Sequence, residues 1–158
     1  MTALADFKED FALLTEAGFV AVSHLDEDGA AKLFHAAQLL DESSVLPKIG
    51  LAAIALHKLE VKNAVAILEE VLAQEPDNVR AGALLGIGYL LSNQNIAKGE
   101  QLLKDAMEKG DDPATKRLGE LWLEVLDKGV RKAESPATPQ KPKHMKEVEE
   151  GDVGDISQ

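Results

Sequence analysis

The stretch Val79-Arg-Ala-Gly-Ala-Leu-Leu-Gly-Ile-Gly-Tyr89 decides the fold, because the small residue Gly86 has counterparts along the chain at a fixed interval. Gly18, Ala52 and Gly86 are equally spaced. Three further pairs of apolar or small residues repeat the same interval: Leu51 and Leu85, Ala30 and Ala64, and Phe34 and Leu68. A period of about 34 residues is typical of a helix-turn-helix unit that cannot bury its apolar face alone, so neighbouring units must stack.

The composition favours a helical core packed through small and aliphatic side chains. Of the 158 residues, 45% are hydrophobic but only 4% are aromatic, while alanine and leucine abound. Both have high helix propensity, whereas strands are enriched in aromatic and β-branched residues. The chain has no cysteine, which excludes disulfides, thiol catalysis and zinc-thiolate sites. One globular domain of ordinary size is therefore expected.

The formal net charge of −11 bears on partners and location. Proteins that bind nucleic acids or anionic membranes carry basic surfaces, so both kinds of partner are disfavoured. No apolar run approaches the ~20 residues that a membrane-spanning helix needs. The residues from Met1 to Asp10 are acidic and resemble neither a secretory signal nor a transit peptide. We therefore expect a cytoplasmic protein that neither binds nucleic acid nor inserts into a membrane.

Apolar spacing and turn residues predict one helix after another over residues 6–126. The turns are expected at residues 26–29, 57–60, 74–78, 92–95 and 110–113. Asp77 or Asn78 is expected to cap the helix that begins at Val79. Pro113 suits the first turn of a last helix. That helix carries an apolar stripe and is predicted to cap the open end of the stack; the stripe consists of Leu118, Leu121, Trp122 and Val125.

The character of the chain changes near its C-terminal end. Beyond Gly129 there are three prolines and no aromatic residue, with a basic segment at 131–146 and an acidic one at 147–155. Such a segment buries too little apolar area to offset its ordering entropy. We predict a helical domain over residues 5–127 and a disordered charged tail over 128–158. Whether the tail is simply solvated or engages a charged partner stays open.

The repeating unit resembles the tetratricopeptide repeat, which favours Leu-Gly and Tyr in its first helix and Ala, a large apolar residue and Ala in its second. Repeat one covers residues 11–44, repeat two covers 45–78, and repeat three begins at Val79 and needs one inserted residue. The matching residues are Gly18, Ala30, Phe34 and Ala37, then Leu51, Ala52, Ala64 and Leu68, then Leu85, Gly86, Tyr89, Gly99, Leu103 and Ala106. The resemblance implies an all-α array of about three helical hairpins plus a capping helix.

Within that family the chain is similar to the small chaperones of bacterial type III secretion, chiefly those that hold the needle subunit. The similarity is carried by the number of repeats, the acidic single domain, and the segments Glu16–Val22 and Val79–Tyr89. It implies a chaperone that sequesters an amphipathic helix of a small apolar export substrate, with or without a second small co-chaperone. Two alternatives are a chaperone of translocator proteins and a scaffold or adaptor subunit of a larger assembly.

The resemblance also implies that fixed positions in the first helix of each unit line a concave face. The residues expected to form this protein-binding groove are Phe19, Val22, Leu46, Ile49, Ala53, Leu56, Ile87, Leu90 and Leu91. Of the Lys, Arg and Asn side chains that clamp a free carboxylate, the inward positions hold only Arg80, so the groove suits an amphipathic helix better than a free carboxylate. An empty apolar groove is an aggregation risk, which favours occupancy or a homodimer. The alternative is that Ile87 and Leu90 pack against the capping helix or the N-terminal helix and leave no groove.

The sequence gives no sign of catalytic chemistry. The four histidines, His24, His35, His57 and His144, lack the spacing that places two metal ligands on one helix face. No nucleophile motif surrounds the serines. We therefore expect a non-enzyme without catalytic residues, metal or cofactor.

Overall fold

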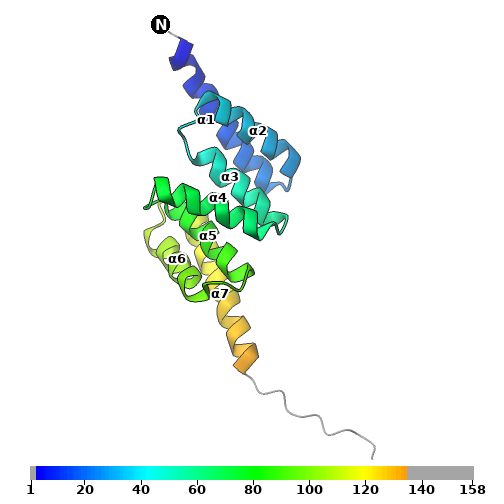
Figure 1. Ribbon diagram of the computed structural model, residues 1–158, viewed down its shortest axis with the longest axis vertical. Helices are drawn as coiled ribbons and strands as arrows, with labels where there is room; N and C mark the ends of the chain where they lie inside the picture. The colour runs from blue at the N-terminus through cyan, green and yellow to red at the C-terminus, as the bar shows by residue number, and fades with distance from the viewer. Residues whose placement is uncertain (1–2, 135–158) are drawn as a thin grey trace, which may run out of the picture.

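The computed structural model describes residues 3–134, which form seven α-helices and no strand (Figure 1). The helices are α1 (Ala3–Ser23), α2 (Glu27–Leu40), α3 (Leu46–His57), α4 (Val61–Gln74), α5 (Val79–Leu91), α6 (Ile96–Lys109) and α7 (Pro113–Glu134). The predicted all-α fold is thus confirmed for this part of the chain. None of these helices is both long enough and apolar enough to cross a lipid bilayer.

The helices pack as a linear stack of hairpins. Helices α1 and α2, α3 and α4, and α5 and α6 pair with each other, and each hairpin contacts the next. Helix α7 packs against α6 and α5 and ends the stack. Figure 1 shows α1 and α7 at opposite ends, where each projects beyond the helices it packs on. Each helix thus buries its apolar side mainly against its neighbours in sequence.

The turns inside the three hairpins repeat with the period seen in the sequence. Leu25, Leu59 and Asn93 have positive φ angles of 61°, 59° and 54°. In each turn the next N–H donates to the carbonyl five residues before it: Asp26 to Ala21, Glu60 to Ala55, and Gln94 to Tyr89. This bonding with a left-handed residue is the Schellman motif that ends helices. The left-handed residue and its hydrogen bond therefore recur with the same period as the sequence pattern.

The first turn lies earlier than predicted. It was expected at residues 26–29, but α2 already begins at Glu27, and the left-handed residue is Leu25. The side chain of Asp26 accepts a hydrogen bond of 2.9 Å from the N–H of Gly29 and caps α2. Acidic residues are favourable in a first helical turn, which is why the acidic run continues as helix.

Two other helix ends agree with the sequence, and the C-terminal boundary differs. Asn78 caps α5 by accepting from the N–H of Ala81 at 3.0 Å, and Pro113 begins α7, both as predicted. Helix α7 continues to Glu134, so residues 128–134 are helical and do not belong to a disordered tail. The rest of the predicted tail, residues 135–158, lies outside the described residues.

The core fills the spaces between successive hairpins. Phe34 of α2 is fully buried and lies against Gly18 of α1 and Gly50 of α3. A Cβ atom on Gly18 would lie 2.6 Å from Cε1 of Phe34, and one on Gly50 would come closer still. Only glycine leaves room for the ring at these two positions, so α1, α2 and α3 approach one another closely around Phe34.

Candidate protein-binding groove

A groove of about 530 Å3 runs along α1 and faces the N-terminal ends of α3 and α5. We call it the α1 groove. It is lined by Phe11, Ala12, Thr15, Glu16, Phe19, Val20, Ser23, Leu46 and Arg80. These residues come from the first helix of each of the three hairpins, so the stacking of the hairpins forms the groove.

The lining of the α1 groove is mainly apolar and open to solvent. The side chains of Val20 and Leu46 are 52% and 38% exposed. Phe19 is half-buried, and its ring meets that of Phe34 edge-on with 5.0 Å between the ring centroids. The hydroxyl of Thr15 donates to the carbonyl of Phe11 at 2.8 Å, so this polar group is already satisfied. The α1 groove is therefore an exposed apolar surface whose polar hydroxyl at Thr15 needs no further partner.

Arg80 reaches across the groove from α5. Its guanidinium carbon lies 5.2 Å from the centroid of the Phe19 ring on α1, within the range of a cation–π contact. Its Nη2 also lies 3.2 Å from Oδ2 of Asp112, the residue that precedes α7. One side chain thus links the first and third hairpins to the start of the last helix.

Asp112 is held in its charged form at the other end of this link. Partial burial acts to raise the pKa of Asp112, but hydrogen bonds from Thr115 and the guanidinium of Arg80 outweigh it and hold that pKa below its usual value. Thr115 donates to Asp112 through its N–H at 2.8 Å and through its hydroxyl at 2.6 Å. Asp112 therefore both caps α7 and neutralises Arg80.

The structure places two of the nine predicted groove residues, Phe19 and Leu46, in the lining of the α1 groove. Four others are buried in the core and do not reach the open surface: Val22, Ile49, Leu56 and Ile87. Ala53 is partly buried and packs against the cluster that holds Phe34. Leu91 is exposed but does not line this groove.

Helix α7 covers the part of the predicted groove that belongs to α5. Its Leu118 and Trp122 pack, together with Leu90, against the buried cluster that contains Leu56 and Ile87. For Ile87 and Leu90 the structure thus has the alternative arrangement, in which they pack against the capping helix α7. The open surface is consequently shorter than predicted and is concentrated along α1.

The repeat pattern does not mark Phe11, Glu16 or Val20 as inward positions, although all three line the α1 groove. A signal was present, since Phe11, Thr15 and Phe19 follow one another at intervals of four, and so do Glu16 and Val20. Residues four apart lie on the same side of a helix. The exposed strip of α1 is therefore wider than the fixed positions of a repeat unit indicate.

A larger hollow of about 990 Å3 lies between α4 and the turn after α5, and its lining is more polar than that of the α1 groove. Six of its ten lining residues are polar, namely Glu60, Lys62, Asn63, Glu69, Ser92 and Gln94, and the other four are Leu59, Val61, Val65 and Ala66. Burial of an apolar partner there would desolvate several polar groups, which costs free energy. The α1 groove is therefore the better candidate for binding an apolar surface.

A scan against models of known protein families finds no match for this sequence. A search of curated proteins finds no matching relative.

Proposed function

We propose that this protein is a cytoplasmic chaperone of bacterial type III secretion that binds an amphipathic helix of a small export substrate, such as a needle subunit, in the α1 groove. The observation that carries the proposal is the exposure of Val20 and Leu46 beside Phe19 in one trough. The similarity of Glu16–Val22 and Val79–Tyr89 to the chaperones of that system supports the choice of pathway. Covering the substrate's apolar stripe would keep it from polymerising before export.

The length of the groove suits a short helix. The groove follows α1 from Phe11 to Ser23, which corresponds to about 18 Å along a helix axis. That length accommodates about three turns of a second helix, whose apolar residues at i, i+4 and i+7 would enter the trough. A few fully desolvated anchoring side chains carry most of the binding energy in protein interfaces.

The groove is poorly suited to capture a chain terminus. Recognition of a free carboxylate needs uncompensated Lys, Arg or Asn side chains. Arg80 is the one basic residue that lines the groove, and Asp112 already pairs with it. The proposed partner is therefore recognised through its side chains.

The proposal is tested by isolating the tagged full-length protein from its native bacterium and identifying its partners by mass spectrometry. A double variant, Val20→Gln with Leu46→Gln, replaces the two most exposed large apolar side chains of the lining without adding charge. Leu39→Gln is the matched control, because Leu39 is exposed on α2 and does not line the groove.

We expect the unaltered protein and the control to recover one small secreted subunit in a complex near one-to-one, and the double variant to lose it. Recovery of only large scaffold or membrane components, equally by all three proteins, would overturn the proposal in favour of a scaffold.

A further inference from the structure

Two charged residues line the α1 groove, Glu16 and Arg80, and their situations differ. Arg80 has Asp112 at 3.2 Å on one side and the Phe19 ring on the other. Glu16 is exposed on α1 and belongs to none of the ion pairs among residues 7–129, the range over which side chains are described. The positive charge in the groove is therefore compensated, and the negative charge is not.

The charge of the whole protein acts in the same direction. A net charge of −11 attracts cationic partners over distances comparable with the Debye length, about 10 Å at 0.1 M salt. A ligand with acidic flanks would meet this field and the carboxylate of Glu16, and the lining of the groove would offer it no free cation to pair with. A ligand with basic flanks would place its charges beside Glu16.

We infer that the helix bound in the α1 groove is cationic: its apolar stripe contacts Phe19, Val20 and Leu46, and Lys or Arg residues flank the stripe on the side of Glu16. This inference rests on the proposed function, because it takes the α1 groove as the site that binds a helix. It adds the charge of the partner, which an apolar trough alone does not specify.

Asp112 does not line the α1 groove, but it contributes to the preference for a cationic helix because it pairs with Arg80. If its charge is removed, the guanidinium of Arg80 becomes an uncompensated cation in the groove. Asp112→Asn makes this change and preserves the cap of α7, because asparagine is also a strong N-cap residue. The preference for a basic ligand should then weaken although the apolar lining is unchanged.

The test uses two synthetic helical peptides with the same apolar stripe, one flanked by lysines and the other by glutamates. Their binding to the full-length protein is measured by fluorescence anisotropy at about 50 mM and about 500 mM salt, since surface charges are screened at the higher concentration. We expect the lysine peptide to bind about two- to fivefold more tightly at low salt, as for exposed ion pairs, and the difference to shrink at high salt.

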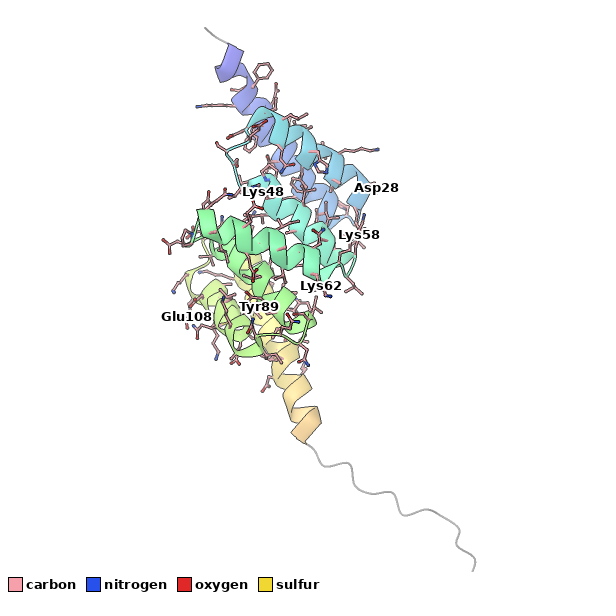
Figure 2. The ribbon with its side chains drawn as sticks, in the orientation of Figure 1. Asp28, Lys48, Lys58, Lys62, Tyr89 and Glu108 are labelled. Carbon is pink, nitrogen blue, oxygen red and sulfur yellow. The ribbon has the colours of Figure 1, made fainter. Side chains whose placement is uncertain are left out.

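Glu16→Gln should reduce this difference, and so should Asp112→Asn. Glu108→Gln is the control of equal charge: Glu108 is exposed on α6 (labelled in Figure 2) and does not line the groove. A similar loss of preference in the control would show that only net charge matters and would overturn the role of Glu16.

Equal affinity for both peptides in the unaltered protein would overturn the inference and leave the proposed function standing. If neither peptide binds, or if Val20→Gln with Leu46→Gln leaves binding unchanged, the proposed function itself fails.

Discussion

Leu25 and Leu59 occupy the same place in successive repeats, and both adopt the left-handed backbone conformation, with φ angles of 61° and 59°. Their side chains are 74% and 71% exposed, so burial does not compensate for the unfavourable conformation. A non-glycine residue in this region costs roughly 1–2 kcal/mol. The hairpin turns are thus maintained by the packing of the helices on either side.

Glycine at either turn should stabilise the protein. We expect Leu25→Gly and Leu59→Gly each to raise the free energy of unfolding by about 0.5–1 kcal/mol, after the added flexibility of the unfolded chain is subtracted. The free energy is measured by urea denaturation. Leu13→Gly is the control, because Leu13 is exposed in the middle of α1, and there glycine should destabilise by about 1 kcal/mol.

The contact of Gly50 with Phe34 gives a second prediction. Gly50→Ala should lower the free energy of unfolding by about 1–3 kcal/mol, because its Cβ would overlap the ring. In the background of Phe34→Leu the same substitution should cost less, so a double-mutant cycle measures the coupling. Equal costs in the two backgrounds would show that the ring is not the cause. Gly129→Ala, with open space around it, should not destabilise.

Ile87 and Leu91 lie on the same helix but should respond differently to a charge. Ile87 is 4% exposed, so Ile87→Glu should cost more than about 3 kcal/mol and compromise folding. Leu91→Glu should cost less than about 1 kcal/mol, because Leu91 is exposed at the end of α5. Circular dichroism during thermal unfolding separates the two results. Loss of partner binding by Ile87→Glu would therefore not identify a contact residue.

Tyr89 is the only tyrosine of the chain and should titrate late. Burial, together with the hydrogen bond to Glu69 (2.7 Å) and its charge, raises the pKa of Tyr89 to about 12. The folded protein thus favours the neutral phenol. The stability that the neutral Tyr89 contributes is present below about pH 10 and is lost as the pH rises toward 12.

Ultraviolet titration checks this assignment. Glu69→Gln should move the pKa of Tyr89 part of the way back toward 10, because burial remains. Glu70→Gln should not, since Glu70 pairs with Lys48 instead. A tyrosine that ionises near pH 10 in the folded, unaltered protein would contradict the buried hydrogen bond.

The repeat period predicted the hairpins well because it reflects contacts between neighbours. The small residues at positions 18 and 86 leave room for the next helix of the same hairpin, while the cap at Asn78 and the start at Pro113 act through nearby backbone atoms. The turn at Leu25 was misplaced because leucine has no intrinsic preference for positive φ, and packing imposes it.

The open surface was harder to predict than the helices. Ile87 and Leu46 both occupy inward positions of their units, but one is buried and the other exposed. The difference arises from α7, whose Leu118 and Trp122 pack over the cluster that includes Ile87. A repeat pattern specifies which side of a helix faces inward, whereas the path of a terminal helix depends on tertiary packing.

The linear stack of hairpins also affects the rate of folding. Since each helix packs on helices close to it in sequence, few contacts need a long loop to close, and chains of this kind fold rapidly. The lining of the α1 groove lies between Phe11 and Arg80, and the partner of Arg80 is Asp112. Every residue of the lining, and Asp112 as well, precedes α7 in the chain, so the groove can form before α7 folds.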